Sequence, residues 1–184
     1  MKVLMLGKTG LLEARGGDRI QVENTASELR KLGVEVDIKT SMEFDPRDYD
    51  VVHIFQLDWT PESYFYAKEA KKYNIPIVLS PIHHDVREVK KFDDKFVFDF
   101  RRISRILFRD QFKRDVFKNV YKSIFDRRML KPTLYSVFYG FKKMQKEVLE
   151  MSEYVLVQTV KEAEDLKRTF NIDFKWQKVL NGVG

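Results

Sequence analysis

The residues Gly7, Lys8 and Thr9 have the order that closes the phosphate-binding loop of many ATPases and GTPases. That loop also requires a glycine five residues before the Gly-Lys pair, so that backbone N–H groups surround the phosphates. Lys2 stands at that position here, and the G-x-G-x-x-G pattern of dinucleotide-binding loops is absent as well. The sequence therefore argues against both kinds of nucleotide loop, and Lys8 and Thr9 are expected simply to follow the first strand.

A glycine pair, Gly16 and Gly17, stands directly before Asp18, which is expected to cap an amphipathic helix. Glycines let an anion such as a diphosphate approach the backbone, and the positive end of the helix dipole favours its charge. Arg15 can add a forked pair of hydrogen bonds to a phosphate. The alternative is that the two glycines only form a flexible turn. The residues alone do not decide between these interpretations.

Adjacent histidines, His83 and His84, follow one apolar run, and Gln56 and Asp58 stand at the end of another. Both runs are typical of buried strands, so these polar side chains are expected at strand ends, where open α/β sheets bind their ligands. Neighbouring side chains on extended backbone point in opposite directions, so one imidazole should face a cleft and the other should point away. His53 lies inside a strand-like run and is interpreted as a hydrogen-bonded core histidine. No spacing of these residues supports a metal site.

The elements that must position these side chains alternate between strands and helices. Short apolar runs predict strands, and patterns with a period of 3.6 predict helices. Gly33 is expected to supply the left-handed residue after the first helix, and Thr159 with Glu162 forms a capping box that opens the last one. Strands are expected at 2–7, 34–39, 51–57, 75–81, 153–159 and 178–180, and helices at 18–32, from the Thr60-Pro61 start, and at 160–170.

Between Val86 and Met151 the sequence has no strand pattern. Apolar residues recur there at helical spacing and Pro132 interrupts them, so two or three helices are expected. The alternation of strands and helices on both sides of this segment predicts a parallel sheet covered on both faces. The expected fold class is α/β, a Rossmann-like doubly wound parallel sheet with an inserted basic helical segment.

The composition is that of a globular protein. The chain has 184 residues, enough for one well-buried α/β domain. It contains no cysteine, so disulfides and thiolate metal sites are excluded. No apolar run is long enough to span a bilayer or to form the core of a signal peptide. A cytoplasmic location is therefore expected.

The net charge of +6 is concentrated in one segment, Val86–Glu147. This basic segment contains 18 Lys and Arg against 8 Asp and Glu, and 13 of the 25 aromatic residues, whereas the remainder has 16 basic and 20 acidic residues. We rank three interpretations. The first is that the aromatic side chains form core while the cations are solvated; the second is peripheral attachment to an anionic membrane, which suits a lipid-linked substrate. The third is nucleic-acid binding through stacked aromatic rings, ranked last because no recognisable nucleic-acid module is present.

Five segments, taken in their order and spacing, resemble the amino-terminal half of GT-B glycosyltransferases of family 4, also called group 1. They are the glycine pair that opens ENTASELRKLGVEVDI, then DYDVVHIF, IPIVLSPIHHD, SEYVLVQTVKEAEDLKRTF and KVLNGVG. The resemblance covers nearly all of the chain except the basic segment. Val34, Leu180 and Gly184 depart from the His, Pro and Asp that are usual at these places.

The resemblance implies that residues 1–184 form the acceptor-side domain of a two-domain enzyme, with a helical insertion at about 90–150. Nothing in this chain matches the carboxyl-terminal, donor-binding domain of the family. The implied activity is transfer of a sugar from a nucleotide-sugar donor to a carbohydrate or lipid-linked acceptor, with retention of configuration and with no metal or cofactor. The chain alone is expected to be inactive. The alternatives are a non-catalytic module that binds a sugar or nucleotide, and a basic scaffold for nucleic acid.

The resemblance also implies roles for individual residues. In the family, a histidine near the end of the fourth strand lies beside the transferred sugar, so His83 or His84 is the expected catalytic residue. Gly16 and Gly17 are expected to bind the donor phosphates. Acceptor or auxiliary contacts are expected from Arg15, Gln56 and Asp58.

Overall fold

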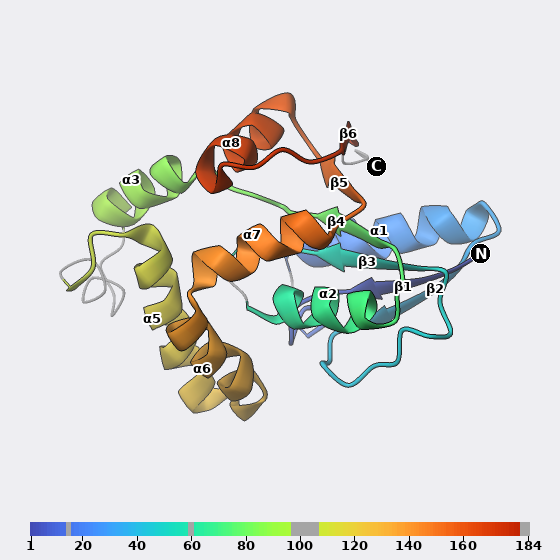
Figure 1. Ribbon diagram of the computed structural model, residues 1–184, viewed down its shortest axis with the longest axis horizontal. Helices are drawn as coiled ribbons and strands as arrows, with labels where there is room; N and C mark the ends of the chain where they lie inside the picture. Colours follow the sequence, from blue (N-terminus) through green and yellow to red (C-terminus); the bar gives the residue numbers. More distant parts are fainter. Residues whose placement is uncertain (14–15, 59–60, 97–106, 181–184) are drawn as a thin grey trace.

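The computed structural model describes residues 1–13, 16–58, 61–96 and 107–180. Within these residues lies one six-stranded sheet in which neighbouring strands are parallel, in the order β2-β1-β3-β4-β5-β6. The strands are β1 (Lys2–Leu6), β2 (Glu35–Lys39), β3 (Val51–Phe55), β4 (Ile77–Ser80), β5 (Tyr154–Val157) and β6 (Trp176–Lys178). The predicted α/β fold class, a doubly wound parallel sheet with inserted helices, is confirmed (Figure 1).

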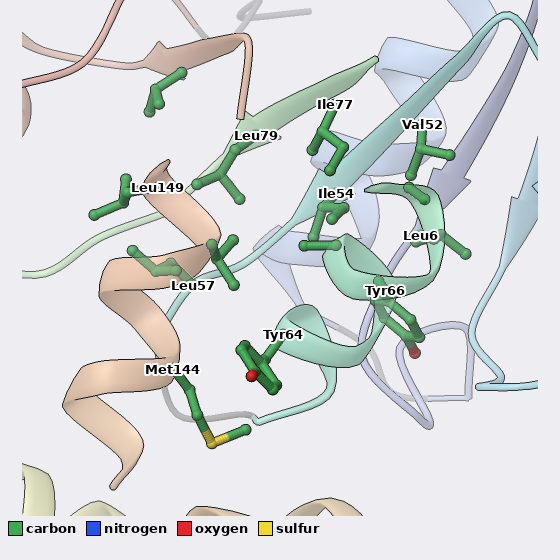
Figure 2. Packing of buried hydrophobic residues seen from close by; sticks show 14 of the residues in the cluster. Leu6, Val52, Ile54, Leu57, Tyr64, Tyr66, Ile77, Leu79, Met144 and Leu149 are labelled. Carbon is green, nitrogen blue, oxygen red and sulfur yellow. The ribbon is translucent and has the colours of Figure 1, made fainter. Parts of the chain in front are cut away.

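Helices cover both faces of the sheet, because alternate residues of each strand point to opposite sides. Along β1, Val3 and Met5 belong to one buried cluster, and Leu4 and Leu6 belong to the other, larger one. Figure 2 shows residues of the larger cluster, with Leu6 among them. The first helix after β1 closes the smaller cluster, and three later helices contribute to the larger one. In that order, these helices are α1 (Gly17–Lys31), α2 (Glu62–Lys72), α7 (Phe141–Met151) and α8 (Val160–Phe170).

Most element ends follow their sequence signals. Gly33 has a φ of +80°, so the predicted left-handed residue after α1 is confirmed. The side chain of Thr159 accepts a backbone N–H three residues on, at 3.1 Å, as its predicted cap requires. The N-cap of α1, however, is Gly16, and Asp18 lies inside the first turn. The prediction that Asp18 caps this helix is therefore wrong, and the last strand begins at Trp176, earlier than predicted.

The basic segment contains more helices than predicted. Its described elements are α3 (Val86–Phe96), α5 (Gln111–Phe125), the 3-10 turn η1 (Arg127–Met129), α6 (Leu130–Tyr139) and most of α7. Pro132 does not interrupt a helix, because it lies in the first turn of α6, where a missing N–H needs no partner. The helices end instead at Asp126, whose carboxylate caps η1, and at Gly140, which has a φ of +95°. The prediction of two or three helices separated at the proline is wrong.

The aromatic residues of the basic segment divide between core and surface. Phe141 is buried, and Phe112 and Tyr135 pack partly buried against the larger cluster. Phe125 and Phe138 are exposed instead. The interpretation of most aromatic side chains in this segment as core therefore does not extend to these two rings. None of the helices in the described ranges has the length and apolarity needed to cross a bilayer.

Candidate functional site

Polar side chains gather at the carboxyl edge of the sheet, first where the strand order reverses between β1 and β3. Ligands of open α/β sheets bind at such a reversal. Here the Asp18 carboxylate accepts hydrogen bonds from Lys8 Nζ, at 2.8 Å, and from Gln56 Nε2. The backbone N–H of Thr9 donates to Glu62 Oε1 at 3.0 Å. Two carboxylates of the protein thus occupy donors that a bound phosphate would otherwise use.

The residues predicted to bind phosphate lie beside this cluster. Gly16 and Gly17 are exposed at the start of α1, and a Cβ atom added to either would meet no heavy atom within 4 Å. The packing of the protein itself therefore does not require glycine at these two positions. Arg15, predicted as an auxiliary contact, lies outside the described residues. The role of this loop in phosphate binding stays a prediction.

A buried histidine lies between two carboxylates just after β4. His83 Nδ1 is 2.9 Å from Asp58 Oδ1, and His83 Nε2 is 3.4 Å from Asp165 Oδ2. Asp58 Oδ2 also accepts the backbone N–H of His84, at 2.9 Å. The side chain of His83 is only 1% exposed. Only the Nδ1 contact is a hydrogen bond, because Nε2 and the Asp165 oxygens have no hydrogen-bond partner among the described residues. Burial and the Asp58 bond therefore hold the ring of His83, which is not presented to a ligand.

Glu162 joins the loops that follow β4 and β5. Its Oε1 accepts the backbone N–H of His83 at 2.8 Å, and its Oε2 accepts that of Gln158 at 2.7 Å. In a full capping box this carboxylate returns to the N-cap N–H. Here it bridges two strand ends, so only the Thr159 half of the predicted box is formed. The bridge fixes the backbone of the two histidines relative to α8.

A pocket of about 850 Å³ opens beside these residues, between α3, α5 and α8. His83 and His84 both line it. His84 is exposed whereas the His83 side chain is buried, so His84 is the histidine that a ligand in the pocket can reach. Four other predicted site residues are described but do not line this pocket: Gly16, Gly17, Gln56 and Asp58. Of these, Asp58 acts on the pocket indirectly, through its hydrogen bonds to His83 and His84.

Sequence reasoning missed the residues that α8 and α5 bring to the pocket. Asp165 and Glu162 lie three residues apart on α8, and Asp115, Lys118 and Lys122 follow one another at intervals of three and four on α5. This spacing places each set on one side of its helix. It was visible in the sequence, but charges at such spacing are also typical of a solvated surface. Only the packing of the helices shows that these sides face the pocket.

The pocket wall formed by α5 carries one carboxylate, Asp115, and two ammonium groups, Lys118 and Lys122. Lys118 Nζ lies 3.3 Å from Asp115 Oδ1. Lys122 retains exposed surface, yet burial of its ammonium lowers its pKa, and the ammonium groups of Lys8 and Lys118 lower it further. A bound anion would relieve this repulsion between cations. The α5 wall thus carries two cations and one carboxylate, whereas Asp85, Glu88, Glu162 and Asp165 also line the pocket.

The third histidine has a structural role. His53 is buried in β3, its Nε2 lies 2.9 Å from Ser80 Oγ, and its ring packs beside Phe55 with centroids 4.1 Å apart. The predicted hydrogen-bonded core histidine is confirmed. In the described part of the chain, no three His, Asp or Glu side chains are grouped so that they could hold a metal ion.

We expect Asp115→Asn to stabilise the protein at neutral pH. Burial raises the pKa of Asp115 from 3.8 to about 6, against the opposing effect of Lys118. Between these two values the folded protein keeps a proton that the unfolded chain has lost, so stability falls as the pH rises through this range. The resulting penalty, at most about 3 kcal/mol, is fully present at neutral pH and absent at acid pH below the unfolded pKa. Asparagine removes the titrating group.

Urea denaturation measures this effect. At neutral pH, Asp115→Asn should be more stable than the wild type by about 2 kcal/mol, and the difference should vanish in acid. Asp173→Asn is the matched control, because Lys167 lowers the pKa of that exposed carboxyl and the expected sign is opposite. An Asp115→Asn protein that is no more stable than the wild type at neutral pH would contradict the assignment of burial as the dominant effect.

No protein-family model matches the sequence, and no curated protein matches it. Among solved structures, a similar one is that of Glycyrrhiza uralensis UGT73P12 complexed with glycyrrhetinic acid 3-O-monoglucuronide. The TM-score is 0.44 and the identity 10%, over 97% of this chain and 48% of the other. This chain thus spans about half the length of that structure.

Proposed function

We propose that this chain is the acceptor-side domain of a GT-B glycosyltransferase, which moves a sugar from a nucleotide-sugar donor to an acceptor. The observation that carries the proposal is the pocket at the carboxyl edge of a doubly wound parallel sheet, with the exposed His84 next to the buried, carboxylate-held His83. A volume of about 850 Å³ is sufficient for a sugar together with part of an acceptor or diphosphate. The resemblance of five sequence segments to family 4 supports the same assignment.

The two histidines have different roles in this proposal. The His84 imidazole hydrogen-bonds a hydroxyl of the transferred sugar or an oxygen of the diphosphate. His83 is a positioning residue, because its contacts with Asp58 and Asp165 fix the backbone turn that carries His84. The buried pair of His83 and Asp58 holds its orientation without a ligand, so the site is organised before the substrate binds.

The transfer breaks the bond between the anomeric carbon of the sugar and a diphosphate oxygen. It forms a bond from that carbon to the acceptor oxygen, and the acceptor proton passes to the departing diphosphate. Negative charge grows on the diphosphate as the bond breaks, so the Lys118 and Lys122 ammonium groups stabilise the transition state. The positive end of the α1 helix dipole, at Gly16 and Gly17, stabilises the same negative charge on the diphosphate. Retention of configuration and independence of metal ions are parts of this proposal.

The proposal includes a separate donor-binding domain that closes over the nucleotide. Residues 1–184 would then be one acceptor-side domain with a helical insertion at about 90–150. The chain alone should release no sugar from UDP- or GDP-sugars, and transfer should appear when the donor-binding domain is added. The DNA that follows the codon for Gly184 should encode an α/β domain with a pair of glutamates about two helical turns apart. Turnover by the isolated chain would contradict this division of labour.

His84→Ala should weaken nucleotide-sugar binding to the isolated chain by about tenfold, because a hydrogen bond to a charged or strongly polar ligand group is lost. Saturation-transfer NMR with UDP-glucose and GDP-mannose as probes measures this affinity. Lys31→Ala, an exposed change at the far end of α1, is the control and should have no effect. Equal affinity of His84→Ala and wild type would contradict the role of His84. Binding without transfer, even with the donor-binding domain present, would instead support a non-catalytic binding module.

A further inference from the structure

The buried residues of the helices α5 and α6 are mostly polar, whereas several of their apolar side chains are exposed. Both stand at the end of the molecule away from the marked N-terminus (Figure 1). A surface helix of a soluble protein normally has the reverse arrangement. The fully buried residues are Gln111, Arg114, Asp115, Asn119 and Ser123 on α5, and Pro132, Thr133 and Ser136 on α6. The outward sides of the two helices expose apolar side chains, and this composition favours a binding partner.

Exposed apolar residues lie on both helices. Ile124 and Phe125 end α5 with exposed fractions of 69% and 74%. On α6, Leu134, Val137 and Phe138 lie three and four residues apart, and Phe138 is 87% exposed. Because α5 and α6 pack against each other, these two sets lie on neighbouring helices. We call these five residues the α5–α6 face.

Positive charge accompanies the α5–α6 face. Residues 111–139 contain seven Lys and Arg against two Asp. Arg127 and Lys131 are exposed in the turn between the two helices and at the start of α6. One of the two acidic residues, Asp126, is paired with Arg128. An exposed apolar face with an excess of cations is typical of helices that lie on an anionic membrane.

We propose that the α5–α6 face inserts shallowly into the surface of a membrane that contains anionic lipids. Its apolar side chains would leave water for the boundary between headgroups and acyl chains, while Arg127 and Lys131 bind lipid phosphates. A second copy of this chain fits less well, because a two-fold contact through this face would bring the same cations together. Charge complementarity therefore favours the lipid surface. The whole basic segment is not needed for this contact, only its α5–α6 part.

This orientation brings the pocket to the membrane surface. Ile124 of the α5–α6 face lies on the side of α5 opposite Asp115, whereas Phe125 follows the pocket-lining Lys118 and Lys122 at the end of the same helix. A polar group on a membrane-anchored acceptor would enter the pocket from the lipid side. This last step rests on the proposed function, whereas the docking itself does not.

Vesicle co-sedimentation of the complete chain tests the docking. Phosphatidylcholine vesicles with one third phosphatidylglycerol should bind the chain about tenfold or more tightly than pure phosphatidylcholine, and added NaCl should weaken that binding. Phe138→Ser should lower the affinity for the anionic vesicles about tenfold. Leu32→Ser is the matched control, because Leu32 is 80% exposed at the end of α1 and should not matter. The double variant Arg127→Glu, Lys131→Glu should bind anionic vesicles about tenfold more weakly than the wild type, and its binding to neutral vesicles should not change.

Circular dichroism checks that each variant keeps its fold, and two outcomes would overturn the proposal. The first is that the chain binds anionic vesicles no more tightly than neutral ones and that Phe138→Ser binds anionic vesicles as tightly as the wild type does. The second is a dimer in sedimentation velocity that Phe138→Ser abolishes, without vesicle binding, which assigns the face to a second copy of the chain. His84→Ala should leave vesicle binding unchanged. A failure of sugar binding would therefore leave the membrane contact standing, and the reverse also holds.

Discussion

Asp58→Ala is expected to lower the free energy of unfolding by about 3 kcal/mol or more. The change removes the acceptor of two donors at once, His83 Nδ1 at 2.9 Å and the backbone N–H of His84 at 2.9 Å. Asp58 is 8% exposed, so water does not readily replace the lost oxygens. The carboxylate of Asp165 lies 3.4 Å from the other ring nitrogen of His83 but makes no hydrogen bond to it, so it does not replace Asp58.

Urea denaturation measures the loss, and two further variants calibrate it. Asp58→Asn keeps one acceptor oxygen and should lose about half as much. Asp50→Ala is the exposed control, because Asp50 Oδ2 accepts one backbone N–H, from Lys2 at 2.7 Å, with water nearby to replace it. The assignment of Asp58 as the residue that organises the site is wrong if Asp58→Ala costs no more than Asp50→Ala. The same variant should weaken nucleotide-sugar binding, because the turn that carries His84 loses its anchor.

Acid should destabilise the protein through His53 by up to about 5 kcal/mol. Burial lowers the pKa of His53 from 6.5 to about 3. Between these values the unfolded chain binds a proton that the folded protein does not bind, so stability is lost as the pH falls through this range. Asp115 acts in the opposite direction over part of the same range, because its pKa is raised to about 6.

His53→Asn isolates the contribution of the histidine. Asparagine does not titrate and can still hydrogen-bond Ser80, so the variant should lose some stability near neutral pH through poorer packing against Phe55. In acid the stability of His53→Asn should approach or exceed that of the wild type, since the variant has no buried histidine to protonate. Unfolding curves at several pH values, recorded in an Asp115→Asn background, measure the slope without the opposing carboxyl. Parallel pH profiles for the two proteins would contradict the assignment.

The sequence alone determined the elements whose requirements are local. The runs of Val, Leu and Ile in β1 and β3 predict strands, because a strand buried on both faces must be apolar on both. Gly33 and Thr159 mark helix ends correctly, since a positive φ and a side-chain N-cap are each satisfied by few residue types. The order of these elements then predicts a parallel doubly wound sheet. The polar residues at the strand ends were also visible in the sequence.

Only the tertiary structure decided which of those polar residues face a ligand. His83 and His84 are equivalent in sequence, and the difference arises because Asp58 and Asp165, from the end of β3 and from α8, enclose one ring. In the same way, the period of α5 and α6 shows that each helix has two sides but not which side turns inward. The buried polar residues Asn119 and Ser136 show that the inward side is the polar one. Burial depends on contacts between residues far apart in the chain, and no local preference of the backbone encodes it.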